Sequence, residues 1–287
     1  MSRGGGRTPA TRWLTVPSFA LLFAAFFAPL LLFLLQALHR FVDGQVTPDW
    51  SLVTLLAFIT DPFGLETLIN SFLLGAVVTA LTLILAYPVA LFMAERRGTL
   101  LFGALALTVF SPVLVSIIVR AYGWQLLLAN NGVVNALLRE FGLAERPLRL
   151  MFNWFGVIVS MIHVELPFML FPILIVLMQI PAALKEAAQD LGATPFQTWR
   201  RAVLPLSVPG ILSGCQIVFT TAISAFASPT ILGGGRVRVM PVTIYQNIVG
   251  LNWPMGAAQS ILLLLFSLLT VALFSRILGR AVPGGAI

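Results

Sequence analysis

The most unusual ionisable side chain in this sequence is the carboxylate of Glu165, which stands inside a long apolar run from Asn153 to Ile180. About 12 residues of helix would carry it roughly 18 Å along this run, at ~1.5 Å per residue. A carboxylate near the middle of a bilayer costs at least about 2.5–3.5 kcal/mol unless it is hydrated or paired. Three interpretations stay open. Glu165 lines a pathway for a cationic solute, it pairs with His163 or with an arginine from another helix, or it lies less deep than this count gives.

Ser160 and His163 are the residues that could form a nucleophile and a base, because they are three apart and would share one face of a helix. A serine hydrolase also needs a strained Gly-x-Ser-x-Gly elbow or an equivalent, and an acidic residue that orients the histidine. Neither pattern occurs here. We therefore expect Ser160 to be a small residue that lets helices approach, and we predict no catalytic residue.

Few side chains are available for metal or phosphate chemistry. His39, His163 and Cys215 are the only histidines and cysteine, and His163 and Glu165 would point to different faces of a helix. A structural metal site needs more ligands, so no metal is predicted. Lys185 is the only lysine and no glycine-rich loop precedes it, so the chain has no Walker A loop. No cofactor is predicted, and any ATP hydrolysis must come from a separate chain.

Aromatic residues near the outer ends of the apolar runs have two possible roles. Most aromatic residues at such positions anchor a helix at the membrane interface. One or two of them could instead hold an ammonium group through cation–π contacts. The candidate substrate pathway therefore contains Glu165, His163, Tyr122, Trp124 and Trp253.

Two stretches rich in proline or glycine raise a similar choice. Pro167 and Pro172 each free a backbone carbonyl four residues earlier, which is tolerated where that carbonyl faces a neighbouring helix or a hydrated cavity. A kink that serves packing alone is the alternative. The stretch from Pro229 to Gly235 is a mobile outer gate, a contact for a binding protein, or an ordinary loop.

One polar segment, Lys185 to Pro209 (KEAAQDLGATPFQTWRRAVLPLSVP), interrupts the long apolar runs. Thr194 can cap a helix, Pro195 suits its first position, and Gln197 completes a capping box. Gly192 can adopt the backbone angles that end the preceding helix. The segment therefore predicts two short helices, joined at an angle at Gly192, that form a docking surface for a soluble partner.

This segment resembles the EAA motif of the membrane subunits, or permeases, of type I ABC importers, and the resemblance extends from about Thr67 to Leu278. Ala202 departs from the family, which often has a branched aliphatic residue there. Three further stretches are similar to the first of the two permeases of spermidine/putrescine importers: Ser111 to Leu128 (SPVLVSIIVRAYGWQLLL), Leu166 to Ile173 (LPFMLFPI) and Asn252 to Ser260 (NWPMGAAQS).

The resemblance implies a permease subunit that is not itself an enzyme and that forms half of a translocation pathway. Its implied partners are a second homologous permease, two ABC ATPase subunits and an extracytoplasmic substrate-binding protein. The implied solute is a polyamine such as spermidine or putrescine. Other small amines, amino-acid-like compounds and phosphonates stay open, as does a transporter or channel that works without ATP. The residues implied in ATPase coupling are Glu186, Ala187, Ala188, Asp190, Gly192, Thr194, Pro195, Arg200, Leu204 and Pro205.

The elements that must position these residues are membrane helices, because the chain is 59% hydrophobic and only 9% charged. Runs longer than about 18 apolar residues are needed to cross a bilayer. Short apolar stretches around Leu52 to Ile59 and Trp124 to Leu138 are expected to lie on the surface or to re-enter, the second because Asn130-Asn131-Gly132 breaks it. We expect an all-α integral membrane protein with about six spans: Leu14 to Gln36, Thr67 to Ala94, Leu100 to Val119, Asn153 to Ile180, Ser207 to Ala227 and Gly256 to Leu278.

Basic residues predict the orientation of these spans. Arg3, Arg7 and Arg12 precede the first span, so the positive-inside rule places the N-terminus, and with six spans also the C-terminus, on the cytoplasmic side of the membrane. The resemblance implies that this membrane is a bacterial inner membrane. The EAA-like segment then lies in the cytoplasm, and Arg120 is counted on the outside. The net charge of +7 is explained by contact with anionic lipid headgroups, so no nucleic-acid partner is predicted.

The expected organisation follows from the spans and their orientation. It comprises a cytoplasmic tail (residues 1–13), a first transmembrane helix (14–36), an extracytoplasmic loop (37–66), the ABC importer transmembrane domain (67–278) and a second cytoplasmic tail (279–287).

Overall fold

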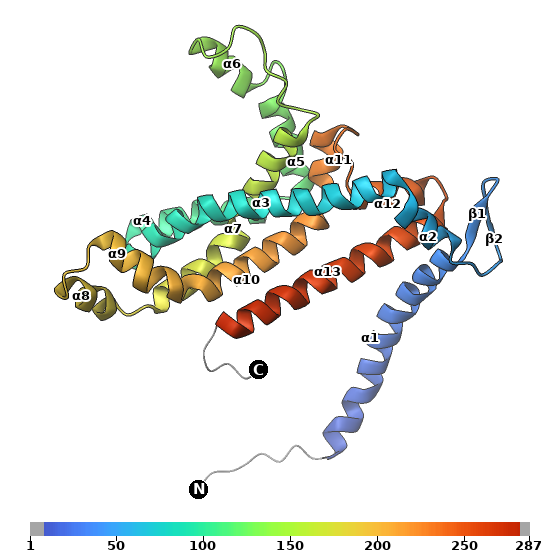
Figure 1. Cartoon of the computed structure of the whole chain (residues 1–287), viewed down its shortest axis with the longest axis horizontal. Helices are drawn as coiled ribbons and strands as arrows, with labels where there is room; N and C mark the ends of the chain where they lie inside the picture. Colours follow the sequence, from blue (N-terminus) through green and yellow to red (C-terminus); the bar gives the residue numbers. More distant parts are fainter. Residues whose placement is uncertain (1–8, 282–287) are drawn as a thin grey trace. The chain divides into compact units, whose positions relative to one another are not determined.

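The computed structural model describes residues 9–281 and consists almost entirely of α-helices (Figure 1). The five long helices are α1 (Pro9–Leu35), α3 (Pro62–Glu95), α7 (Trp154–Gln179), α10 (Leu204–Ile223) and α13 (Trp253–Ala281). The short helices are α2 (Val53–Thr60), α4 (Leu100–Phe110), α5 (Ile117–Leu128), α6 (Val133–Glu140), α8 (Ala182–Asp190), α9 (Pro195–Thr198), α11 (Ala227–Gly233) and α12 (Met240–Val249). One antiparallel hairpin pairs β1 (Arg40–Val42) with β2 (Gln45–Thr47).

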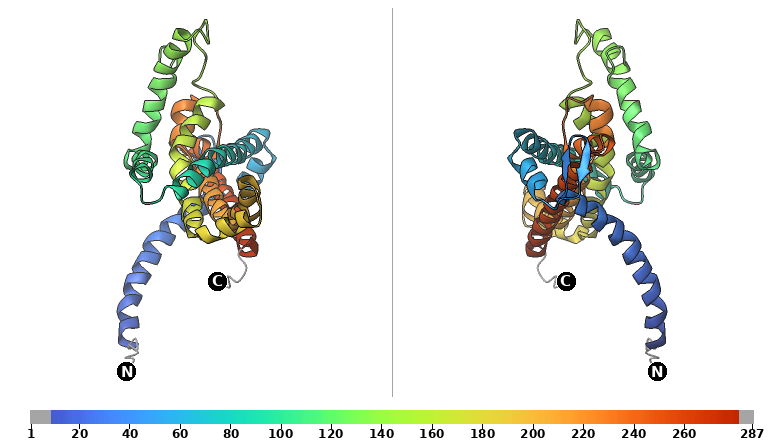
Figure 2. Two further views of the ribbon diagram at one scale, coloured as in Figure 1. Left: turned by 90° about the vertical axis from the view of Figure 1, so that its left-hand side faces the viewer. Right: turned by 90° about the vertical axis from the view of Figure 1, so that its right-hand side faces the viewer.

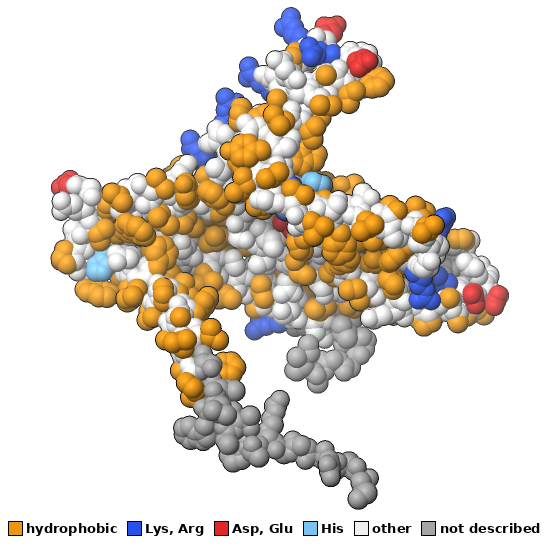
Figure 3. Space-filling model, turned by 180° about the vertical axis from the view of Figure 1, so that it is seen from behind, with side chains coloured by type: hydrophobic (Ala, Val, Ile, Leu, Met, Phe, Trp, Pro, Cys, Tyr) orange, Lys and Arg blue, Asp and Glu red, His pale blue; other side chains and the backbone are white. Residues whose placement is uncertain are grey.

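Five helical segments within residues 9–281 are long and apolar enough to cross a membrane, and a bent pair of helices brings the number to six if it counts as one span. The predicted number of spans is therefore confirmed by length and composition. The five segments are Phe19–Leu38, Pro62–Glu95, Trp154–Gln179, Pro195–Ile223 and Trp253–Gly279. Hydrophobic side chains cover much of the visible surface, as a protein surrounded by lipid requires (Figure 3).

The third predicted span, Leu100 to Val119, is wrong as one continuous helix. The chain leaves α4 through a 3-10 turn at Ser111–Leu114 and becomes extended at Val115 before α5 begins. The segments Leu100–Leu114 and Ile117–Glu140 differ in direction by 103°, and Figure 2 shows this sharp turn between α4 and α5. Pro112 accounts for the break, because it has no N–H to donate and its ring clashes with the carbonyl four residues earlier.

The structure divides into two compact units, of which the smaller contains residues 9–62 and 244–262. Its buried centre is formed by Ala37, Ala257 and Ala258, with Phe33, Leu55 and Ile261 packed around them. The hairpin turns at Asp43-Gly44, where both residues have positive φ angles of 51° and 81°. This is the left-handed geometry that two-residue hairpin turns require, and Asp-Gly is a preferred sequence for it.

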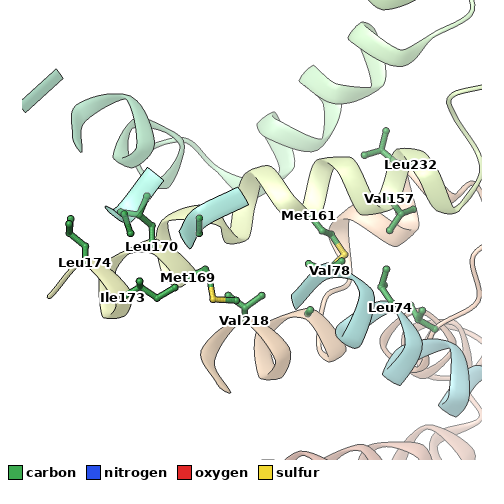
Figure 4. Close-up of a cluster of buried hydrophobic side chains, with 14 of the residues drawn as sticks. Leu74, Val78, Val157, Met161, Met169, Leu170, Ile173, Leu174, Val218 and Leu232 are labelled. Atoms are coloured by element: carbon green, nitrogen blue, oxygen red, sulfur yellow. The ribbon is translucent and has the colours of Figure 1, made fainter. Parts of the chain in front are cut away.

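The larger unit, residues 63–243 and 263–281, has α7 at its centre, packed against α10 along its length and against α11 and α5. Figure 4 shows the buried side chains of α3, α7 and α10 that meet here. Val78, Met169 and Ile173 in this cluster have no solvent-exposed surface. Each such side chain contributes about 1.5–3 kcal/mol relative to water in a soluble protein, but in lipid the gain comes mainly from close packing.

Close packing of α7 and α10 depends on two glycines of α10. A Cβ atom added at Gly210 would lie 2.7 Å from the carbonyl oxygen of Pro172, and one at Gly214 would lie 2.8 Å from the sulfur of Met169. Both prolines of α7 lie inside a helix that continues to Gln179. Pro172 therefore lies against a neighbouring helix rather than at a helix end, which agrees with the packing alternative for this residue.

Candidate functional site

Glu165 is buried in the middle of α7, with only 5% of its surface exposed. The hydroxyl of Thr221, on α10, donates a hydrogen bond of 2.8 Å to Glu165 Oε2. The same hydroxyl lies 2.9 Å from the carbonyl oxygen of Ile217 and 3.0 Å from that of Val218. A threonine hydroxyl has one proton, so the carboxylate competes with these two carbonyls for it. Glu165 is thus a buried acid with one shared hydrogen bond.

Arg120, on α5, is the charged partner of this carboxylate. Its guanidinium group interacts electrostatically with Glu165 and with His163. Among the described residues the only ion pair shorter than 4.0 Å is Lys185–Glu95, so Arg120 and Glu165 are near each other without direct contact. The second interpretation of Glu165, a pair with an arginine from another helix, agrees with this arrangement.

His163 and Trp124 connect the same two helices. Trp124 Nε1, on α5, donates a hydrogen bond of 3.2 Å to His163 Nδ1, on α7, and the two rings are 5.7 Å apart. Trp124 lies four residues after Arg120, so both side chains leave the same face of α5. We call Arg120, Trp124, His163, Glu165 and Thr221 the polar cluster; it joins three helices in the larger unit.

The sequence analysis missed Arg120 and Thr221. Arg120 was counted among outer basic residues, although a lone arginine in the apolar stretch Ser111 to Leu128 is a signal that this charge is buried or paired. Thr221 carries no such signal, because threonines in membrane helices are ordinary residues that bond to their own helix.

The other residues of the predicted pathway lie elsewhere. Tyr122 is on α5 but 54% exposed, and Trp253 belongs to the smaller unit, where its ring packs against Phe33 at 6.5 Å. Ser160 is buried and donates to the carbonyl of Val157 at 2.9 Å. Ser160 therefore packs within its helix, as expected, and does not pair with His163.

The EAA-like segment forms a surface of the larger unit. Helix α8 has no buried residue, and Glu186, Ala187 and Asp190 on it are exposed. Its only ion pair joins Lys185 Nζ to Glu95 Oε1 at 3.5 Å, and both side chains are substantially exposed. Exposed pairs contribute at most about 1 kcal/mol, so the fold alone does not explain this polar helix.

Gly192 ends α8 in the way that the sequence predicts. Its φ angle is +84°, and its N–H donates to Gln189 O at 2.8 Å, while Ala193 N–H donates to Ala188 O at 3.0 Å. These bonds satisfy carbonyls that a helix end leaves free. The space around Gly192 is open, so the backbone angle, and not crowding, requires glycine here.

The predicted capping box at Thr194 is confirmed. Gln197 N–H donates to Thr194 Oγ1 at 3.3 Å, and Thr194 N–H donates to Gln197 Oε1 at 2.9 Å. Pro195 occupies the first turn. The helix that starts here is longer than expected.

The prediction of a separate second short helix is wrong. Helix α9 continues through a π-helical turn (Trp199–Val203) into α10, and the whole segment Pro195–Ile223 is one candidate span. Leu204 and Pro205 do not interrupt the helix. Pro205 follows directly after the π turn, where the regular α-helical hydrogen bonds are already replaced by a wider pattern. Arg200 is exposed on this segment, so the residues predicted to couple to an ATPase lie on one exposed helix and on the first turns of a candidate membrane helix.

The stretch from Pro229 to Gly235 is not an irregular loop. Residues up to Gly233 belong to α11, and Gly234 follows with a φ angle of +53°. Phe152 N–H donates to Leu232 O at 2.8 Å, and a Cβ atom at Gly234 would lie 2.2 Å from the Phe152 ring. These contacts join the end of α11 to Phe152, shortly before α7 begins.

Comparisons with known proteins identify the family. No protein-family model matches the chain. The "Spermidine/putrescine transport system permease protein PotB" of Escherichia coli (strain K12) is 32% identical over 232 residues, which cover 78% of this chain and 82% of that protein. The "Inner membrane ABC transporter permease protein YdcU" of the same strain is 31% identical over 268 residues, which cover 88% of this chain and 84% of that protein.

A solved structure shares the fold. The chain resembles one in the crystal structure of a bacterial alginate ABC transporter in complex with an alginate pentasaccharide-bound periplasmic protein, with a TM-score of 0.80, 21% identity and 96% of each chain covered. The predicted fold class is therefore confirmed. The candidate spans and these relatives lead to one conclusion: the chain is a multi-pass membrane transport subunit that belongs to the family of ABC transporter permeases.

Proposed function

We propose that this chain is one of the two permease subunits of an ATP-driven importer for a polyamine such as spermidine or putrescine. The observation that carries the proposal is the 32% identity to a spermidine/putrescine permease over 82% of that protein. The buried carboxylate of Glu165 is compatible with a cationic solute, since it is the only buried acid among the described residues and lies inside a candidate span.

The importer would contain a second homologous permease, two ATPase subunits and an extracytoplasmic substrate-binding protein. ATP hydrolysis would take place on the separate ATPase subunits. The exposed helix α8, the Gly192 turn and Arg200 support this assignment, because they offer polar and apolar side chains that nothing within residues 9–281 covers. Closure of the ATPases would move α8 and, through the continuous segment Pro195–Ile223, the helix that carries Thr221. Transport then requires contacts that differ between the two states.

Uptake by the reconstituted complex tests the function. The complete importer, with the second permease, the ATPases and the binding protein, is placed in liposomes that contain ATP, and uptake of labelled putrescine and spermidine is measured. We expect uptake that needs both ATP and the binding protein. ATP-independent uptake by this chain alone would instead indicate a secondary transporter or channel, and uptake of a different amine, an amino acid or a phosphonate would change the substrate only.

Thiol labelling tests the proposed orientation, in which both termini lie on the cytoplasmic side of a bacterial inner membrane. In a background in which Cys215 is replaced by serine, single cysteines are placed at Asp49, Arg236 and Gln197, three exposed positions. An impermeant reagent should label the first two from outside and the third only after permeabilisation. Labelling of the cysteine at position 197 from outside would show that the orientation is the opposite of the one proposed.

A further inference from the structure

The guanidinium group of Arg120 lacks hydrogen-bond acceptors. Its Nε and Nη1 atoms are both buried, and neither finds a partner among residues 9–281. An arginine stays charged at every pH that a protein meets, so it cannot relieve this situation by losing a proton. Arg120 as a whole is only partly buried, but two buried guanidinium nitrogens without acceptors are unfavourable, especially inside a membrane. Arg120 therefore needs an acceptor within reach of its side chain.

Glu165 is the candidate for this acceptor. Its charge interacts with Arg120, and its one described hydrogen bond, from Thr221, is shared with two backbone carbonyls. A carboxylate has about four lone-pair sites, so most of its accepting capacity is free. His163 also faces Arg120, but its Nδ1 already accepts from Trp124.

We propose that Arg120 is the resident counter-ion of Glu165 and that an ammonium group of the transported solute replaces it there during each transport cycle. This inference rests on the proposed function, because it needs a cationic solute. One carboxylate neutralises one cation, and two cations beside it repel each other, so the arriving ammonium group displaces the guanidinium group. When the ammonium group leaves, Arg120 returns. Because Arg120 competes with the ammonium group for Glu165, it lowers the affinity of Glu165 for the solute and allows the solute to dissociate from this position.

The free acceptor sites of Glu165 fit the arrival of an ammonium group. An ammonium group brings three donors and accepts nothing. The unused accepting capacity of this carboxylate therefore suits an amine better than an anion. A phosphonate or other anion would satisfy Arg120 but would meet the Glu165 charge.

The decisive experiment compares four forms of the complete complex: wild type, Arg120→Gln, Glu165→Gln and the double variant. Binding of labelled putrescine to the purified complex is measured, together with uptake in proteoliposomes. We expect Arg120→Gln to bind putrescine at least about tenfold more tightly and to transport it more slowly. The double variant should lose this additional binding, because the carboxylate that causes it is gone. Unchanged or weaker binding by Arg120→Gln overturns the proposal.

Assembly supplies a second readout if Arg120→Gln does not fold. A lone buried charge destabilises a protein, whereas removal of both partners of a pair is often tolerated. The double variant should then restore the yield of intact complex, and Arg120→Lys, which keeps the charge, should assemble well. A double variant that assembles no better than Arg120→Gln overturns the pairing. A wild-type complex that neither binds nor transports putrescine refutes the proposed substrate instead, while the assembly comparison still tests the pair.

Discussion

The proposed coupling segment (residues 182–203, called the coupling segment below) and the polar cluster are built in opposite ways. Both contain polar residues whose roles the fold alone does not explain. In the coupling segment, hydrogen bonds join residues three to five apart, as in the capping box of Thr194 and Gln197, and α8 has no buried residue. In the polar cluster, hydrogen bonds join residues 39 and 56 apart, such as Trp124 with His163 and Thr221 with Glu165, and the acid is buried.

This difference teaches what each region can do. A locally built, exposed helix keeps its shape while it binds a separate subunit, so it suits the transmission of force. A cluster shared by three helices changes whenever these helices move, so it suits the detection of conformational state. The continuous segment Pro195–Ile223 joins the two regions, because it begins at the capping box and carries Thr221 near its end.

The largest effect is expected at the turn of the coupling segment. Gly192→Val forces a β-branched residue to a φ angle of +84°, at a cost of about 1–3 kcal/mol. Because 1.4 kcal/mol is a factor of ten in an equilibrium, we expect ATP-driven uptake to fall about five- to a hundredfold while the chain still inserts in the membrane. Uptake in proteoliposomes and the amount of chain in the membrane are measured together.

Gly98→Val is the matched control for this variant. Gly98 has a φ angle of +79° and open surroundings, like Gly192, but it lies in the turn between α3 and α4. The control carries the same backbone strain outside the coupling segment, so its uptake should fall much less. Equal losses in the two variants would mean that strain in general, and not the Gly192 turn, limits transport.

An intermediate effect is expected in the polar cluster. Thr221→Val keeps the side-chain shape but removes the hydrogen bond to Glu165, and such bonds to charged groups contribute about 1.5–3 kcal/mol in soluble proteins and less in membranes. Uptake should fall about three- to tenfold with a normal yield of complex. The neighbouring Thr220→Val is the control, since Thr220 donates only to Gln216 O, at 2.8 Å. A similar loss in both variants would show that Glu165 does not depend on Thr221.

The contrast between the two regions also explains how far the sequence predicts the structure. The Gly192 turn and the capping box follow from residues within a few positions of one another, so their geometry is predictable. The Arg120–Glu165 pair depends on how α5, α7 and α10 pack, and no local pattern specifies that packing. Pro112 is a different case, because the sequence contained the signal for the break after α4, but the apolar length of the run was given more weight.

A smaller effect is expected on the exposed face of α8. Glu186→Lys reverses a charge at the proposed ATPase contact, and an exposed pair there contributes about 0.2–1 kcal/mol, so the ATPase that co-purifies should fall about two- to fivefold. The loss should shrink at high salt, which screens exposed charges. Glu140→Lys, at an equally exposed position on α6, should leave co-purification unchanged. A Glu186→Lys complex with normal ATPase content would place the contact elsewhere on the coupling segment.

The smallest effect is expected where the segment that joins the two regions meets α3. The hydroxyls of Tyr87 and Ser207 are hydrogen-bonded at 3.0 Å, and the Tyr87 ring lies 6.3 Å from that of Trp199 in the π turn. Ser207 already donates to Leu204 O at 2.8 Å, so Tyr87 is the donor of the pair. Tyr87→Phe removes one neutral hydrogen bond but keeps the ring contact, and we expect Tm in detergent to fall by about 2–4 °C with little change in uptake.

Two further variants decide what this bond does. Tyr122→Phe removes a hydroxyl from an exposed tyrosine, so its Tm should equal that of the wild type. Ser207→Ala leaves the Tyr87 hydroxyl without its acceptor, so it should lower Tm more than Tyr87→Phe does. If Tyr87→Phe instead lowers uptake as strongly as Thr221→Val while Tm stays constant, the bond acts in transmission between the two regions. The contact of the segment Pro195–Ile223 with α3 would then be needed for transport and not only for stability.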